Sequence, residues 1–188
     1  LRELARGPKR FRDLLDGLEG IGTNLLSARL KSLEEAGVVE KVTLPAPAEV
    51  PAYDLGPRGR TLEPIIEDLA LWGFETGEIE AKGLRTRAVW AAMSMRAQMV
   101  RSDSNPPDGN YAFEVGDEKF WLMVKDGESK LRDGAPPFEA DVSVTMDGQA
   151  FFAVATGAAA PVEAGAAVEG DGPLLEELLE SFQLPALP

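Results

Sequence analysis

The chain of 188 residues has a formal net charge of −13, with 44% hydrophobic and 27% charged residues. It holds no cysteine and no histidine, which excludes disulfides, thiolate zinc sites, cysteine nucleophiles and Ser-His-Asp triads within these residues. The length and composition suit two globular domains, and no apolar run is long enough to span a membrane.

Residues 7–18 predict a turn, a short extended piece and a helix with apolar residues at helical spacing. A second helix follows from Thr23, and Gly37 stands where a left-handed residue ends a helix. The apolar stripe of this second helix consists of Leu26, Leu30 and Leu33. The order predicts a helix-turn-helix.

The exposed side of the second helix carries small polar residues that suit contacts with DNA. We expect Thr23 to cap the helix, its first amides to face a phosphate, and Asn24 and Ser27 to read base edges. The residues predicted to contact DNA are Arg10, Thr23, Asn24, Ser27, Ala28, Arg29, Lys31 and Lys41. The alternative is an ordinary surface helix with a solvated face.

Two extended runs, 38–43 and 51–55, are joined by a proline-rich segment and predict a hairpin wing. The segment from Leu44 to Leu55 contains no Lys or Arg, which weakens the expected contact of the wing with phosphate. Residues 56–60 are expected to form a break between the hairpin and a helix over 61–73. One face of that helix carries Leu62, Ile65, Ile66, Leu69 and Trp72. This face either packs on the winged helix or forms a dimer seam.

The first part of the chain resembles the HxlR-type winged helix-turn-helix regulators, from residue 1 to about residue 73. The matching residues are Leu1, Arg2, Glu3, Leu4, Gly7, Arg10, Phe11, Asp13, Leu14, Ile21, Leu26, Ser27, Arg29, Leu30, Leu33, Glu34, Gly37, Tyr53, Leu55, Gly59 and Arg60. The resemblance implies a symmetric dimer on operator DNA, with 23–31 as the recognition segment. That family begins with a helix ahead of the Leu-Arg-Glu-Leu segment, so we expect further residues before Leu1.

Charge is distributed unevenly between the two parts of the chain. Residues 1–74 carry ten Lys or Arg against twelve Asp or Glu, so the remainder holds −11 of the −13 charge. We expect a local basic patch to contact phosphates while the acidic part suppresses binding to random sites. The patch consists of Arg6, Lys9, Arg10, Arg12, Arg29, Lys31 and Lys41.

The second part reads as helix, then strands, then helices. A Met- and Ala-rich helix at 84–100 is apolar over most of its circumference, which predicts burial on two sides. Turn residues at 101–109 precede four extended runs, at 110–115, 119–125, 128–132 and 140–146. Helical stretches follow at 148–156 and 173–183. The pattern predicts an α+β domain with a mainly antiparallel sheet. The expected divisions are 1–77 for the winged helix, 78–109 for a connecting segment and 110–183 for the α+β domain.

The α+β part resembles the sterol carrier protein type two-like domain over about 110–182. The matching residues are Tyr111-Ala112-Phe113-Glu114-Val115, Trp121, Ala140-Asp141-Val142, Phe151, Gly157, Ala166-Ala167-Val168-Glu169-Gly170-Asp171 and Leu174-Leu175. The resemblance implies helices packed on a sheet around an apolar tunnel. The candidate lining residues are Trp90, Met93, Met95, Met99, Phe113, Trp121, Met123, Met146, Phe151, Phe152 and Phe182, with Tyr111, Ser143, Thr145 or Gln149 orienting a polar group. The alternative for each apolar residue is plain core.

These features together predict a cytoplasmic, dimeric transcription regulator that binds double-stranded operator DNA. Its second domain would bind a hydrophobic small molecule that modulates operator binding, and no cofactor is expected. The alternative is a lipid-binding or carrier protein whose winged helix is a protein-interaction module. An enzyme ranks last, because no pair of carboxylates has a distinctive spacing. Nor do Gly17, Gly20 and Gly22 form a dinucleotide fingerprint.

Overall fold

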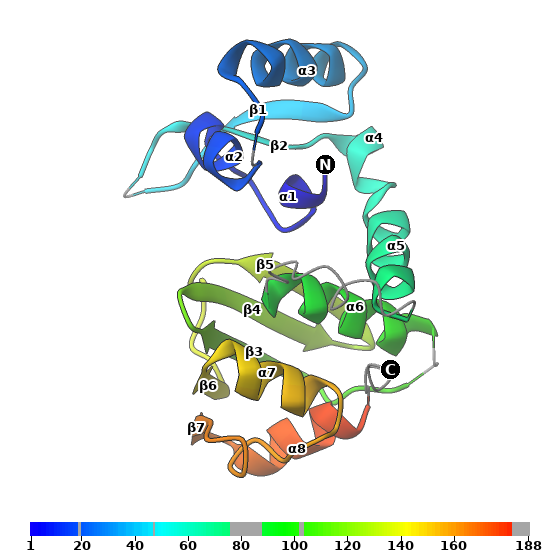
Figure 1. Ribbon diagram of the computed structural model, residues 1–188, viewed down its shortest axis with the longest axis vertical. Coiled ribbons are helices and arrows are strands. Elements are labelled where there is room, and N and C mark those ends of the chain that lie inside the picture. The colour runs from blue at the N-terminus through cyan, green and yellow to red at the C-terminus, as the bar shows by residue number, and fades with distance from the viewer. Residues whose placement is uncertain (19, 47, 76–87, 102–103, 182–188) are drawn as a thin grey trace. The chain divides into compact units, whose positions relative to one another are not determined.

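The computed structural model describes residues 1–18, 20–46, 48–75, 88–101 and 104–181 (Figure 1). The chain divides into two compact units, Leu1–Ile66 and Glu67–Pro188. The division falls within one helix, α5 (Glu63–Glu75). Helix α6 (Ala88–Arg101), which we expected in a connecting segment, belongs to the second unit. Across the described ranges, no helix combines the length and apolar character needed to cross a membrane.

The N-terminal unit contains the predicted helix-turn-helix. Its first three helices are α1 (Arg2–Ala5), α2 (Phe11–Gly17) and α3 (Thr23–Glu35). Helix α3 ends where Gly37 adopts φ +67°, a conformation that glycine reaches without the steric cost of a Cβ. The Gly37 N–H donates to the Glu34 carbonyl and the Val38 N–H to the Leu33 carbonyl, each at 2.9 Å. These two bonds form a Schellman motif, so the predicted end of the helix is confirmed.

The wing is an antiparallel hairpin of β1 (Val39–Thr43) and β2 (Pro51–Leu55). Val39 lies opposite Leu55, and both side chains are buried. Lys9, ahead of α2, adds a short bridge to the outer edge of β2 through two backbone hydrogen bonds with Tyr53, of 2.8 and 2.9 Å. Helices α3 and α1 pack against the hairpin, which therefore forms one side of the small N-terminal core.

Residues 56–60, expected as simple punctuation, instead contain one helical turn, α4 (Pro57–Arg60). Pro57 occupies the first helical position, where its missing N–H costs no hydrogen bond. A Cβ at Gly59 would lie 2.0 Å from the Val38 carbonyl oxygen, so the close approach of α4 to the start of β1 requires glycine there.

The C-terminal unit is built on a five-stranded sheet in the order β5-β4-β3-β6-β7 (Figure 1). The strands are β3 (Gly109–Val115), β4 (Glu118–Lys125), β5 (Glu128–Asp133), β6 (Val142–Met146) and β7 (Ala167–Gly170). Among the described strands of this sheet, β3 and β6 pair in parallel and the other neighbours are antiparallel. Strand β7 was not predicted, because it has four residues and no alternation of buried and exposed side chains. The predicted α+β class is confirmed.

Three helices of this unit pack with the sheet: α6, α7 (Gly148–Ala155) and α8 (Gly172–Glu180). Helix α6 contacts α7, β4 and β5, and eight of its fourteen residues are buried. The carboxylates of Asp147 and Asp171 cap α7 and α8 by accepting hydrogen bonds from backbone N–H groups, at 2.8 and 3.1 Å. The apolar side chains between these helices and the sheet form the second core.

Candidate DNA-binding face and apolar cavity

Helix α3 is anchored on one side and polar on the other. Leu26 and Leu30 are each 4% exposed, while Leu33 is half-buried. The opposite side exposes Thr23, Asn24, Ser27, Ala28, Arg29 and Lys31. Six of the eight residues predicted to contact DNA therefore lie on the exposed part of one helix.

The predicted cap of α3 is wrong. Gly22 is the N-cap residue and Thr23 is already the first helical residue, so the cap residue makes no side-chain hydrogen bond to this end. Glycine has no side-chain oxygen to accept from the first-turn N–H groups, so these groups have no side-chain partner from the cap. The amides at the start of α3 remain suited to a phosphate oxygen.

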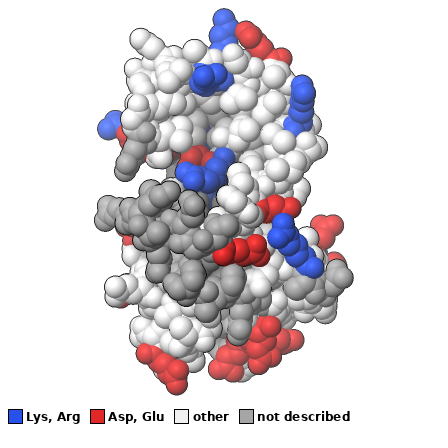
Figure 2. Space-filling view, turned by 45° about the vertical axis from the view of Figure 1, so that its right-hand side comes forward, with Lys and Arg blue, Asp and Glu red and all other residues white. Residues whose placement is uncertain are grey.

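Several cations of the predicted patch are paired with carboxylates. The Lys41 ammonium lies 2.9 Å from a Glu34 carboxylate oxygen, and the Lys31 ammonium lies 3.9 Å from Glu35. The hydrogen bond and charge of Glu34 raise the pKa of Lys41, which keeps this side chain protonated. On the face shown in Figure 2, the Lys and Arg side chains of the N-terminal unit stand apart from one another.

Arg6 does not belong to the surface patch. Its side chain is 1% exposed and donates to the carboxylate of Glu3, which is itself buried. The pairing follows from their i, i+3 spacing along the first helical turn. Arg6 lies close to the helix-turn-helix in the sequence, but only the tertiary structure shows that its charge is paired with a buried carboxylate.

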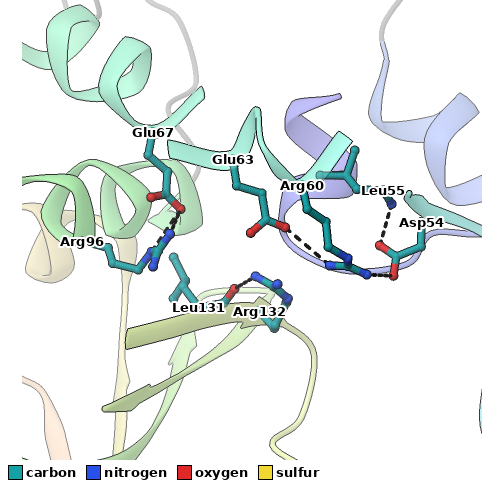
Figure 3. A network of polar contacts seen from close by, with 8 residues as sticks. All are labelled: Asp54, Leu55, Arg60, Glu63, Glu67, Arg96, Leu131 and Arg132. Atoms are coloured by element: carbon teal, nitrogen blue, oxygen red, sulfur yellow. Dashed lines mark hydrogen bonds and ion pairs between the residues drawn. The ribbon is translucent and has the colours of Figure 1, made fainter. Parts of the chain in front are cut away.

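The wing and the segment after it hold their cations in internal contacts. Arg58 donates to the carbonyl of Ala36 at 3.3 Å, which ties α4 to the end of α3. Arg60 contacts Asp54 at 2.8 Å and Glu63 at 3.6 Å, as Figure 3 shows. The wing itself has no Lys or Arg from residue 44 to 55. Helix α3 is therefore the main candidate for contact with DNA in this unit.

Helix α5 exposes a row of large apolar side chains. Ile65, Leu69 and Trp72 are 61%, 64% and 59% exposed, whereas Leu71 on another side of the helix is 2% exposed. The three exposed residues follow the spacing of one helical face. Leu62 and Ile66 of the same predicted face are half-buried, and both roles predicted for this face stay predictions.

An apolar cavity of about 40 Å³ lies between the sheet and helices α6, α7 and α8. Among the residues proposed from the sequence, Met95, Met99, Phe113, Met146 and Phe151 line it. The remaining lining residues are Ala92, Arg96, Phe120, Leu122, Leu131, Val144, Val154, Ala155, Pro161, Leu175 and Leu179.

Five candidates do not line the cavity: Trp90, Met93, Trp121, Met123 and Phe152. On β4 the side chains alternate, so Phe120 and Leu122 face the cavity, and Trp121 and Met123 lie on the other side of the sheet. There Trp121 packs edge-on against Phe138, with ring centroids 5.1 Å apart.

The helical candidates fail for the same geometric reason. On α6 the lining residues Ala92, Met95, Arg96 and Met99 recur at three and four residues, which leaves Trp90 and Met93 on other sides. Phe152 follows Phe151 directly and is half-buried beside it. Counting three residues back from Met99, as along a helix, gives Arg96. Counting two residues on from Phe120, as along a strand, gives Leu122.

None of the four proposed polar residues lines the cavity. Tyr111 is fully buried and donates its hydroxyl to the Pro107 carbonyl at 3.1 Å. Burial raises the pKa of Tyr111 to about 12, so its hydroxyl is neutral at physiological pH. Ser143, Thr145 and Gln149 are likewise not lining residues, and Phe182 lies outside the described residues.

Arg96 is the one charged side chain among the described residues that line the cavity. Its guanidinium forms a hydrogen-bonded ion pair with the Glu67 carboxylate on α5 (Figure 3). A further N–H donates to the backbone carbonyl of Ser129 on β5 at 2.7 Å. The side chains of Arg96 and Glu67 are 15% and 9% exposed, so this ion pair is largely removed from water.

Comparison with known proteins gives a family for the first part of the chain. Residues 1–81 match the family model described as HxlR-like helix-turn-helix. The transcriptional regulator YvaP of Bacillus subtilis is 33% identical over 73 residues, which cover 39% of this chain and 68% of that protein. A regulator of Synechocystis, sll1512, is 38% identical over 66 residues, covering 35% of this chain. The chain spans about half the length of this second relative, 49%.

Two solved structures are similar to parts of the chain. Sterol carrier protein 2 from Aedes aegypti, in complex with palmitate, has 21% identity and a TM-score of 0.41, covering 52% of this chain and 99% of that chain. The sec-alkylsulfatase Pisa1 from Pseudomonas has 20% identity and a TM-score of 0.43, covering 48% of this chain and 16% of that chain. At these identities and TM-scores, neither likeness assigns an activity or a ligand to this chain.

Proposed function

The chain belongs to the HxlR-like helix-turn-helix family, and on that premise we propose that it is a transcriptional regulator that binds operator DNA in the cytoplasm. The observation that carries the proposal is the two-sided character of α3. Leucines hold the helix against the hairpin, and its free side offers hydrogen-bonding groups of a size that reaches base edges.

In this proposal α3 enters the major groove by its N-terminal half. Asn24 and Ser27 hydrogen-bond to base edges, and Ala28 allows the close approach of a base or its methyl group. The amides at the start of α3 and the cations Arg29 and Lys31 contact phosphates, which orients the helix without reading sequence.

The proposed regulator is a dimer joined through the apolar face of α5, namely Ile65, Leu69 and Trp72. Exposure of so apolar a face to water is unfavourable. In a two-fold dimer the face would be covered by the same face of the second copy. The dimer would set the separation of two recognition helices and therefore the spacing of operator half-sites.

The C-terminal unit is proposed to bind a hydrophobic small molecule in the apolar cavity. The described cavity of about 40 Å³ is far below the ~300–1,000 Å³ typical of ligand pockets, so binding must separate its walls. Met95 and Met99 in the wall are flexible enough to repack around a guest.

The proposal is tested by titrating a fluorescent DNA fragment from the upstream region of the protein's own gene across a salt series, beside a scrambled fragment. We expect preferential binding of the upstream fragment. Asn24→Ala should weaken binding to this fragment by about 1–3 kcal/mol and leave binding to the scrambled fragment unchanged, because it removes base contacts only.

Ser32→Ala is the matched control, because Ser32 is exposed on the same helix but lies in its C-terminal half. Its affinity for both fragments should equal that of the unchanged protein. Equal affinity of the unchanged protein for the two fragments would refute sequence-specific regulation. The same outcome would favour a lipid-binding or carrier protein, a candidate that the lack of Lys and Arg at 44–55 and the paired cations support.

A further inference from the structure

Arg96 joins two parts of the C-terminal unit. Its stem belongs to the wall of the apolar cavity, and its guanidinium holds Glu67 in the first turns of α5. The carbonyl of Ser129 on β5 fixes the same guanidinium from the sheet side. The side chain that a cavity ligand would meet therefore also forms the more buried of the two described ion pairs between α5 and α6.

The size of the cavity makes this connection consequential. A ligand larger than a few water molecules must displace side chains of the wall, and α6 supplies four lining residues, with Arg96 between Met95 and Met99 in chain order. Repacking of this stretch moves the stem of Arg96. The hydrogen bonds to Glu67 and Ser129 depend on the position of that stem.

Charge determines which ligands can break the ion pair. The Arg96 guanidinium is neutralised by the Glu67 carboxylate, and both are largely shielded from water. An anionic group entering beside Arg96 would add a second carboxylate to one buried cation, which is strongly unfavourable in apolar surroundings. Binding of the anion is balanced only if Glu67 leaves for water. A neutral apolar ligand makes no such demand.

We propose that the cavity takes an amphiphile with one anionic group, that this group replaces the Glu67 carboxylate on Arg96, and that the exchange releases α5 from α6. The proposal rests on the ligand-binding part of the proposed function and names its ligand class and its means of regulation. Because the two carboxylates compete for one cation, removing the charge of Glu67 strengthens binding of the anion.

The test compares dodecanoate with dodecanol, which differ in charge but share the apolar chain, by calorimetric titration of the full chain. Dodecanoate should bind the unchanged protein and should bind Glu67→Gln about tenfold more tightly, because its competitor has lost its charge. The affinity for dodecanol should be the same in both proteins. Hydrogen exchange of residues 68–75 should accelerate on binding dodecanoate and not on binding dodecanol.

Asp68→Asn is the matched control. Asp68 is the next residue of α5 and pairs with Arg101 of α6 at 3.0 Å, but this pair is half-exposed and Arg101 does not line the cavity. The variant loosens an α5–α6 contact without touching the cavity, so its dodecanoate affinity should equal that of the unchanged protein.

Each other outcome overturns the exchange. If dodecanoate binds and neither Glu67→Gln nor hydrogen exchange of α5 responds, the cavity is a ligand site without the exchange. If neither probe binds, the exchange and the ligand part of the proposed function both fail, while the DNA titration still decides the regulator. Should Glu67→Gln fail to fold, hydrogen exchange of the unchanged protein with the two probes decides the question alone.

Discussion

Lys41 is a predicted phosphate contact whose charge is partly used by a neighbour. Glu34 lies 2.9 Å away, at the end of α3, and raises the pKa of Lys41. Both side chains are accessible to water, so the pair can exchange partners with a phosphate at little cost to the fold. If Lys41 contacts a phosphate as predicted, the carboxylate of Glu34 competes with that contact and lowers the affinity for DNA.

Glu34→Gln should raise affinity for DNA of any sequence. The pKa of Lys41 would fall toward its ordinary value, which leaves the ammonium charged at neutral pH and available to a phosphate. The slope of log affinity against log salt should steepen by about 0.9, as for one added phosphate contact. Fluorescence titrations at several salt concentrations measure the slope, and an unchanged slope would show that Lys41 lies away from the DNA.

Gly59 lies where α4 approaches the start of β1 too closely to leave room for a Cβ. Gly59→Ala places a Cβ 2.0 Å from a backbone oxygen that cannot rotate away, so α4 must shift from β1. We expect a loss of about 1–3 kcal/mol in the free energy of unfolding, measured by urea titration. Gly17→Ala is the control, because its Cβ would meet only Glu3 at an ordinary 3.7 Å.

At the scale of elements, α5 is the helix whose exposed side most needs a partner. Its buried side carries Leu71 and the ion-paired Glu67, while Ile65, Leu69 and Trp72 are left to water. A lone surface apolar residue is ordinary, but three on one face of a helix are typical of an interface.

Leu69→Glu should convert the proposed dimer to a monomer, because a two-fold seam would bury two unpaired carboxylates. The dimer dissociation constant, measured by sedimentation velocity over a concentration series, should rise at least about tenfold. Val162→Glu is the comparison, since Val162 is 77% exposed and lies in the C-terminal unit away from α5 in sequence. An unchanged constant in Leu69→Glu would exclude α5 as the seam.

At the scale of the whole molecule, the charge of the chain opposes the binding of DNA that α3 favours. The N-terminal part is near neutrality and the C-terminal part carries most of the negative charge. On the face shown in Figure 2, acidic side chains gather over the C-terminal unit. In the proposed regulator, this negative field would repel DNA of any sequence, so only sites with good base contacts would retain the protein.

Replacing Glu176 and Glu180 with Lys should raise affinity for scrambled DNA and lower the ratio of specific to nonspecific binding. Both residues are exposed on α8, so the change alters charge without altering the core. The Gln double variant changes half as much charge and should produce about half the effect on log affinity. Both effects should vanish as salt shortens the Debye length below about 10 Å. An increase that persists at high salt would indicate a direct contact instead.

The sequence by itself determined the local structure of the winged helix. Helix α3 begins and ends where the leucine stripe and Gly37 predicted, and β2 spans the predicted residues, because these features depend on neighbours in the chain. The strands β3 to β6 were also predicted closely, from turn residues and alternation. The roles of the predicted site residues on DNA or ligand remain predictions.

Only the tertiary structure decided which side of each element meets which partner. Arg6 is buried against Glu3, and Arg96 links the cavity to Glu67, twenty-nine residues away in the chain. The burial of Arg6 and the pairing of Arg96 arise from how helices and strands stack, and periodicity identifies a face without saying what covers it. The parallel pairing of β3 with β6 and the short strand β7 likewise depend on contacts that no local pattern encodes.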